Sequence, residues 1–244
     1  MDEIRLTITS STNDDARQRF RGVPLVVVAA EQTHGVGRMG RTWHSPRGGL
    51  WLTLAWPPRL PLAAYQALSL VAGLATADAI ENTCRLDARI KWPNDLLVER
   101  GGVWRKLCGI LCQSDATRSL ILIGIGINAN FPASELGEGL RLPPTTLHDE
   151  LGHDIDLVEL EQNLITTLHS ALVAYEEGHW PARLLPAVRT RLCWTGLEVH
   201  CADAMGTNTA VGVLQGIDDS GRLLIESGHK LQALVGGEVS IANG

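Results

Sequence analysis

The fold class of this chain is decided by the stretch from residue 88 to residue 128, which reads ARIKWPNDLLVERGGVWRKLCGILCQSDATRSLILIGIGIN. Short apolar runs alternate here with turn residues, notably Gly101-Gly102 and Asp115-Ala116-Thr117. Turns this short join antiparallel strands, whereas parallel strands need a crossover of about a dozen residues or more. The stretch therefore predicts an α+β fold with a mixed, largely antiparallel sheet and argues against a doubly wound parallel sheet.

The segments on either side add strands and helices. Apolar runs rich in Val, Leu and Trp predict buried strands at residues 24–30 and 49–56. A first helix is expected to begin at Pro61 and to end near Asn82, because small and apolar residues recur there at helical spacing. A second helix is expected between Asp156, a favourable N-cap, and Gly178.

The character of the sequence changes near Cys193. Short β-type runs then alternate with turns, the clearest of them at residues 218–221. A run of roughly 50 residues of this kind is typical of a small β-barrel. We therefore expect two domains, residues 1–192 and residues 193–244.

Composition narrows the class of protein. Lys and Arg total 21 against 27 Asp and Glu, a formal charge of −6, which does not favour binding to DNA by bulk electrostatics. The five cysteines are odd in number and contain no CxxC pair, which indicates reduced thiols rather than disulfides or zinc. The sequence has no signal peptide and no apolar segment of membrane-spanning length. We expect a cytoplasmic protein with no DNA and no membrane partner.

The loop after residue 31 has an unusual composition. Gly35, Gly37 and Gly40 satisfy the pattern GxGxxG, but no helix can follow directly, since a Ser-Pro pair and a Gly-Gly pair come next. The same loop carries Arg38 and Arg41, whose guanidinium groups suit carboxylate and phosphate. The combination indicates a clamp for a small anion, and the alternative from composition alone is a solvated surface loop.

Five motifs occur in a fixed order along the chain: STN at 11–13, QTHGVGRMGRTW at 32–43, KWPND at 91–95, KLCGIL at 106–111 and GIGINAN at 124–130. Together they resemble the biotin protein ligases, in the short form without an N-terminal DNA-binding domain. The resemblance implies a catalytic domain related to class II aminoacyl-tRNA synthetases, followed by an SH3-like β-barrel.

The resemblance also implies an activity. Members of that family use ATP with Mg²⁺ to activate biotin as biotinyl-5′-AMP, and then transfer biotin to one lysine of a biotin carboxyl carrier protein domain. Such carrier domains belong to acetyl-CoA carboxylase and other biotin-dependent carboxylases. The expected enzyme is therefore a carbon–nitrogen ligase.

Site residues follow from the resemblance, motif by motif. Those expected to bind biotin are Ser11, Thr12, Gln32, Gly35, Arg38, Lys106, Gly109 and Leu111. Those expected to bind ATP are Arg38, Arg41, Lys91, Asn94, Gly126 and Asn128. The catalytic residues implied are Lys106, Arg38 and Asp95, and no side chain is expected to bind a metal. Trp43, Trp51, Trp56 and Trp92 are interpreted as packing aromatics.

Two departures from the family pattern keep alternatives open. Val36 stands where many relatives have arginine, and Gln113 stands where an acidic residue often follows. A lipoate or octanoate ligase of the same superfamily is one alternative, and a biotin-binding sensor without catalysis is another. Ser11 lies too near the start of the sequence for a preceding winged helix, so transcriptional repression is not expected. The choice between monomer and homodimer is left open.

Overall fold

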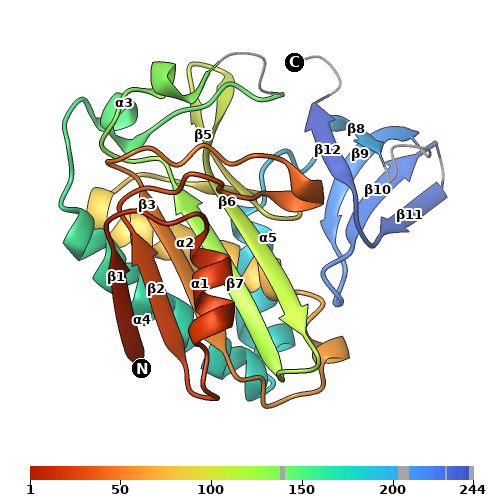
Figure 1. Ribbon diagram of the computed structural model, residues 1–244. Helices are drawn as coiled ribbons and strands as arrows, with labels where there is room; N and C mark the ends of the chain where they lie inside the picture. The colour runs from red at the N-terminus through yellow and green to blue at the C-terminus, as the bar shows by residue number, and fades with distance from the viewer. Residues whose placement is uncertain (138–140, 203–208, 229, 242–244) are drawn as a thin grey trace.

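The computed structural model describes residues 1–137, 141–202, 209–228 and 230–241, and it contains a large and a small β-sheet (Figure 1). The large sheet has seven strands in the order β1-β2-β3-β7-β6-β5-β4. Its strands are β1 (Asp2–Leu6), β2 (Leu25–Ala29), β3 (Leu50–Trp56), β4 (Arg89–Lys91), β5 (Asp95–Arg100), β6 (Val103–Asp115) and β7 (Leu120–Ile127).

The pairing in the large sheet confirms the predicted fold class. Only β1 and β2 are parallel, and every other neighbouring pair is antiparallel. The turn between β5 and β6 uses Gly101 and Gly102, both with positive φ. The sheet is therefore mixed but largely antiparallel, with a single parallel pair at one edge.

Two long helices cover one face of this sheet. Helix α2 (Leu68–Cys84) lies against β4, β5 and β6, and α4 (Leu157–Glu176) packs on α2 (Figure 1). Asp156 caps α4 as predicted, since its carboxylate accepts hydrogen bonds from two backbone N–H groups of the first turn. The opposite face carries α1 (Thr12–Arg19), which contacts β2, β3 and β7.

The predicted start of the first long helix is wrong. Pro61 has an extended ψ of 141°, and only a short 3₁₀ turn, Leu62–Ala64, follows it. Tyr65 explains the delay: its hydroxyl bonds to Glu176 at the end of α4 and accepts from the backbone N–H of Arg59 at 3.2 Å. These bonds hold the segment as a loop, and α2 begins only at Leu68.

Several elements have no counterpart among the predictions. Strand β1 carries charged residues along most of its length and pairs only at the sheet edge. The other unpredicted elements are short helical segments: α3 (Leu147–Leu151), a π-helical turn (Trp180–Leu184), α5 (Leu185–Arg191) and two 3₁₀ turns (Arg38–Gly40 and Ala133–Leu136). Tertiary packing, rather than a strong local pattern, maintains such short elements.

The C-terminal region forms a small β domain, but the described strands do not close into the predicted barrel. Its strands are β8 (Glu198–Ala202), β9 (Thr209–Ile217), β10 (Leu223–Ser227), β11 (Lys230–Leu234) and β12 (Glu238–Ile241). They form one antiparallel sheet in the order β11-β10-β9-β8-β12. The chain turns away from β11 at Gly236-Gly237, so that β12 pairs with β8 instead of with β11.

The two sheets share one hydrophobic core. The buried cluster around α2 and the large sheet continues into Val199, Leu223 and Val239 of the C-terminal sheet. Trp92 adds a hydrogen bond from its indole Nε1 to the carbonyl of Gly221 at 3.0 Å. The small sheet is thereby fixed against one end of the large sheet. In the part of the chain that the structure describes, none of the helices combines the length and apolar character needed to cross a membrane.

Candidate active site

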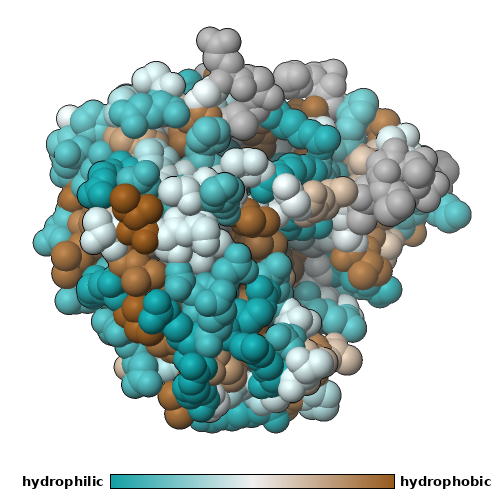
Figure 2. Space-filling view, viewed as in Figure 1, coloured by the Kyte–Doolittle hydropathy of each residue, from teal (hydrophilic) through white to brown (hydrophobic). Residues whose placement is uncertain are grey.

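A cavity of about 840 Å³ lies where the two sheets meet. Its walls come from β6 and β7, from the loop after β2, from the β4–β5 turn, and from β8 and β12 of the C-terminal sheet. Figure 2 shows the surface hollowed between the two lobes. All predicted site residues line this cavity except Gly35.

Gly35 lies behind the cavity wall. A Cβ atom there would come within 2.4 Å of the carbonyl oxygen of Trp43 and 2.7 Å of the hydroxyl of Ser45. The backbone of Trp43 also donates a hydrogen bond to the Gly35 carbonyl at 2.8 Å. Glycine is therefore required at position 35 because the loop packs closely on itself there. Gly35 does not line the cavity directly.

One end of the cavity is lined by neutral polar groups. The side-chain oxygen of Gln32 accepts from the backbone N–H of Thr12 at 2.8 Å and lies 3.0 Å from the Thr12 hydroxyl. Its amide nitrogen donates to the hydroxyl of Ser45 at 2.8 Å. Ser11 is the N-cap of α1, but its side chain makes no capping hydrogen bond to that helix. Hydroxyl and amide groups so arranged suit a neutral polar ligand.

A second layer holds this end in place. The side-chain oxygen of Gln113 accepts from the Asn13 amide at 3.1 Å and from Arg17 at 3.0 Å. A Cβ atom at Gly124 would lie only 2.4 Å from the side-chain oxygen of Asn13, so the glycine leaves room for that amide. Gln113 thus supplies an uncharged acceptor that joins Asn13 to Arg17.

A buried carboxylate lies between two lysines at the centre of the cavity. Asp95 contacts Lys106 Nζ at 2.8 Å and Lys91 Nζ at 3.3 Å. Lys91 and Asp95 are cross-strand partners of β4 and β5, and Lys106 comes from the adjacent β6. Burial alone would raise the pKa of Asp95, but Lys106 and Lys91 together bring that pKa below its usual value. Burial lowers the pKa of Lys91. Asp95 is therefore an ionised, fully engaged carboxylate at neutral pH.

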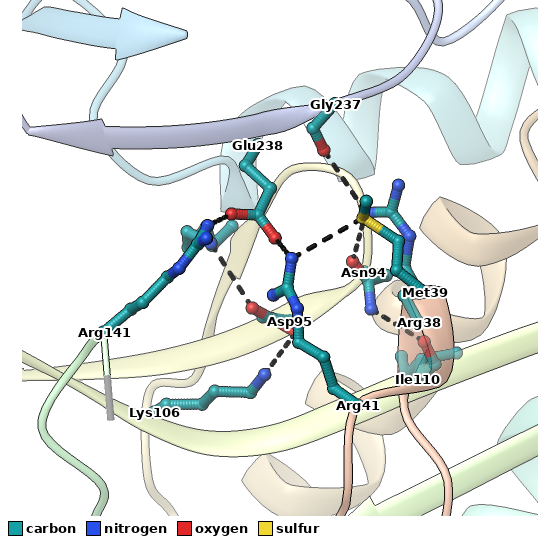
Figure 3. A network of polar contacts seen from close by, with 11 residues as sticks. Arg38, Met39, Arg41, Asn94, Asp95, Lys106, Ile110, Arg141, Gly237 and Glu238 are labelled. Atoms are coloured by element: carbon teal, nitrogen blue, oxygen red, sulfur yellow. Dashed lines mark hydrogen bonds and ion pairs between the residues drawn. The ribbon is translucent and has the colours of Figure 1, made fainter. Parts of the chain in front are cut away.

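The glycine-rich loop carries its arginines to the same place. Arg38 donates to the side-chain oxygen of Asn94 at 3.0 Å and to the carbonyl of Gly237 at 3.3 Å (Figure 3). Arg41 is bonded to the carboxylate of Glu238 on β12. Met39 has φ 57° and Gly40 has φ 72°, which turns the loop tip sharply enough to point both arginines toward β12.

Trp43 lies across a flat platform of two glycines. Gly109 and Gly126 are directly paired between β6 and β7, and a Cβ atom at Gly126 would lie 2.3 Å from the indole Nε1. The Lys106 ammonium is 5.0 Å from the centroid of a Trp43 ring. Trp43 therefore lines the cavity, although the sequence analysis assigned it to packing.

Asn128 supplies an unpaired polar atom beyond this platform. The residue is 2% exposed, and its amide nitrogen donates to the carbonyl of Thr145 at 3.0 Å. Its side-chain oxygen is buried and has no hydrogen-bond partner among the described residues. Because a buried acceptor without a donor is costly, this atom indicates a position for a ligand donor.

The comparisons with known proteins agree with this geometry. Residues 3–130 match the Biotin/lipoate A/B protein ligase family, and residues 198–241 match the Biotin protein ligase C terminal domain. The chain belongs to the biotin/lipoate A/B protein ligase family. The second match makes this assignment more specific, because residues 198–241 include most of the small β domain and match a domain described for biotin protein ligases.

Relatives of this ligase family match over most of the chain. The biotin–acetyl-CoA-carboxylase ligase of Paracoccus denitrificans is 33% identical over 248 residues, covering 96% of this chain and 98% of that protein. The bifunctional ligase/repressor BirA of Bacillus subtilis is 32% identical over 226 residues, or 88% of this chain. The match spans 66% of the length of that BirA protein.

A solved structure of the family gives the same overall arrangement. Biotin protein ligase from Aquifex aeolicus, in complex with biotin and ATP, superposes with a TM-score of 0.85 at 27% identity. The superposition covers 98% of this chain and 97% of that one. The C-terminal sheet is therefore included in the likeness.

The ligase cavity also contains residues that the sequence analysis did not assign to it. Besides Trp43, the additional charged or titratable residues are His44, Arg141, His200, Cys201 and Glu238. Trp43 follows the arginine-rich loop directly, which could have suggested a role, but the others carry no local motif. Over the four described ranges, no group of three or more His, Cys, Asp or Glu side chains is close enough to hold a metal ion.

Proposed function

We propose that this protein is an ATP-dependent ligase that activates biotin as biotinyl-5′-AMP and transfers it to a specific lysine of a biotin carboxyl carrier domain. The observation that carries the proposal is the cavity itself. It combines a neutral polar end, a cationic centre and the unpaired side-chain oxygen of Asn128. Full-length similarity to the biotin–acetyl-CoA-carboxylase ligase of Paracoccus denitrificans supports it.

Biotin would bind at the polar end. Its ureido group can donate and accept hydrogen bonds, and Ser11, Thr12 and Gln32 offer hydroxyl and amide partners there. Leu111 adds apolar wall, and Gly109 leaves space beside it. The carboxylate at the end of the biotin chain would then reach the lysine–aspartate cluster.

Adenylation brings two anions together, so it needs cations more than it needs a nucleophile on the protein. A biotin carboxylate oxygen attacks the α-phosphorus of ATP, and the bond to the leaving pyrophosphate breaks. Lys106 would contact both partners, because its ammonium is positioned by Asp95 and faces the cavity. Arg38 and Arg41 would bind phosphate oxygens from the loop side, with Arg38 also shielding the mixed anhydride from water.

The adenine ring would lie beyond this centre. The unpaired oxygen of Asn128 can accept from the exocyclic amine of adenine. Trp43 presents an indole face beside Gly126, which suits stacking of an aromatic base. Lys91 and Asn94 complete this proposed nucleotide site. Lys91 forms an ion pair with Asp95, and Asn94 accepts a hydrogen bond from Arg38.

The second step transfers the biotinyl group. The amine of the acceptor lysine attacks the biotinyl carbonyl, a new amide bond forms, and AMP leaves. Asp95 is a weak base, because two lysines keep its pKa low. We therefore propose that Asp95 orients Lys106 and the incoming amine through hydrogen bonds. It would not remove the proton of the acceptor lysine completely.

Mg²⁺ would enter with ATP. The two carboxylates of the cavity, Asp95 and Glu238, are each engaged by two cationic side chains. Phosphate oxygens and water would therefore provide most of the ligands of the metal, which is the usual arrangement for Mg²⁺ with nucleotides.

The proposal extends to partner, location and domains. The acceptor is the carrier domain of a biotin-dependent carboxylase, in the cytoplasm, and all five cysteines are free thiols, as suits a reducing compartment. Repression through DNA and binding to membranes are not part of the proposal. We place the domain division between residues 192 and 193, and a sedimentation experiment would decide between monomer and homodimer.

Two alternatives can be separated from the biotin reaction. Lipoate ligation is less well supported because residues 198–241 match a domain described for biotin protein ligases. A sensor without catalysis is less well supported because the Lys106–Asp95–Lys91 cluster is complete.

The test is to incubate the purified protein with MgATP, a biotin carboxyl carrier domain, and either biotin or lipoate, and then to measure the intact mass of the carrier. A biotinyl adduct that disappears when the acceptor lysine is replaced is the expected result. A lipoyl adduct alone would move the protein to the first alternative, and no adduct together with no pyrophosphate release would favour a sensor.

A further inference from the structure

Arg141 is a cation of the cavity that no motif of the sequence explains. Its guanidinium is bonded to Glu238, the same carboxylate that engages Arg41, but it reaches that carboxylate from a different loop (Figure 3). Arg41 belongs to the loop after β2, whereas Arg141 precedes α3. Glu238 therefore bridges two arginines from separate segments across the wall of the cavity.

The segment that carries Arg141 is anchored to the proposed reaction centre. The backbone N–H of Lys106 donates to the carbonyl of Pro143 at 2.8 Å, and Thr145 donates back to the carbonyl of Lys106 at 2.9 Å. The carbonyl of Thr145 also accepts a hydrogen bond from the side-chain amide of Asn128 at 3.0 Å. Arg141 thus lies only a few residues before a segment, residues 143–145, that is hydrogen-bonded to both Lys106 and Asn128.

The charges of the cavity are arranged in two similar groups. Asp95 is shared by Lys91 and Lys106, and Glu238 is shared by Arg41 and Arg141. Five Lys and Arg side chains and two carboxylates line the cavity, a formal balance of +3 in a chain whose net charge is −6. This excess of positive charge is available to a polyanion such as the triphosphate of ATP.

The ion pair of Arg141 with Glu238 is suited to exchange. The Arg141 side chain is 76% exposed, and pairs this exposed contribute little because solvent screens them. A phosphate group offers the same guanidinium two or more charged oxygens and can replace a single carboxylate.

We propose that Arg141 is a third arginine of the nucleotide site, which binds the phosphates that leave as pyrophosphate, and that Glu238 holds its guanidinium until the nucleotide arrives. This inference rests on the proposed ligase function. It assigns Arg141 to the first half-reaction only, because biotinyl-5′-AMP retains just the α-phosphate, whereas the two phosphates that Arg141 would bind have left as pyrophosphate.

The experiment compares the two half-reactions in Arg141→Ala. Biotin-dependent pyrophosphate exchange measures adenylation, and single-turnover transfer from synthetic biotinyl-5′-AMP to the carrier domain measures the second step. We expect kcat/KM for ATP to fall roughly ten- to a hundred-fold, the effect of losing a charged hydrogen bond, with transfer unchanged. Arg141→Lys should fall between, since it keeps the charge without the bidentate fork.

Arg222→Ala is the matched control, because Arg222 is also an exposed arginine paired with a carboxylate, in the turn between β9 and β10, and it lies outside the cavity. It should match the wild type in both assays. Unchanged adenylation in Arg141→Ala, or an equal loss in both half-reactions, would overturn the inference. Absence of biotin-dependent exchange in the wild type would instead reject the proposed function, so the two failures are distinguishable.

Discussion

At the scale of single residues, Asp95 is the group whose environment determines most of the site. Lys106 and Lys91 outweigh its burial and lower its folded pKa, whereas an unfolded Asp titrates near pH ~3.9. The ion pairs therefore stabilise the fold above about pH 4, and this contribution is lost as pH falls through the lowered folded pKa. Asp95→Asn should accordingly lose most stability at pH 6–8 relative to wild type, with a smaller difference near pH 3. The midpoint of urea unfolding, measured for both proteins at a series of pH values, gives this difference in stability. A difference that does not change with pH would contradict the assigned ion pairs.

Lys106 gives the largest expected effect on chemistry. We propose that its ammonium lies between the two reacting anions, and positioned charges of this type are worth roughly 10²–10³ in rate. Lys106→Ala should lower biotin-dependent pyrophosphate exchange by at least that factor. Lys230→Ala is the matched control, since Lys230 is an exposed lysine on β11 outside the cavity. Equal exchange in the two variants would remove Lys106 from the mechanism.

Asn128 separates nucleotide binding from biotin binding. Its unpaired oxygen is proposed to accept from adenine, while biotin is proposed to bind at the other end of the cavity, beside Gln32. Asn128→Ala should raise KM for ATP by about ten-fold, the loss of roughly one hydrogen bond, with the Kd for biotin unchanged. Calorimetry with biotin and steady-state kinetics with ATP check the two halves. A matching loss of biotin affinity would indicate general damage to the site.

At the scale of elements, the β6–β7 pair provides a platform that depends on glycine. Gly126→Ala would place a Cβ atom within 2.3 Å of the Trp43 indole, so the ring must move off the cavity wall. We expect adenylation to fall at least ten-fold, on the order of 1.4 kcal/mol. Gly73→Ala in α2 is the control, because its Cβ would meet Ile90 at an ordinary 3.7 Å. Undiminished adenylation in Gly126→Ala would show that the position of Trp43 is unimportant.

The same elements show how far the sequence alone could lead. The turns at 101–102 and 115–117 and the cap at Asp156 are local signals, and they predicted the hairpins and α4 correctly. The start of α2 was missed because Tyr65 is held by Glu176, which lies 111 residues away in sequence. The cavity brings together the predicted site residues except Gly35, whereas Arg141 and Glu238 meet only through the tertiary fold.

At the scale of the whole molecule, the two sheets should unfold together. Leu223 of the C-terminal sheet is fully buried in the same cluster that contains the core of the large sheet. Leu223→Ala should cost about 2–5 kcal/mol and still give one transition. Urea unfolding followed by tryptophan fluorescence and by far-UV circular dichroism tests this. Separate transitions for the two signals would show that the C-terminal sheet is an independent unit.

The central claim is that one cavity both forms the biotinyl adenylate and delivers it. The most direct measurement is to incubate the protein with biotin and MgATP, remove free nucleotide, add carrier domain without ATP, and follow the intact mass of the carrier over time. We expect rapid gain of one biotinyl group on the acceptor lysine, in an amount limited by the protein supplied. A carrier that stays unmodified until ATP is added again, or that is labelled equally when its acceptor lysine is replaced, would contradict it.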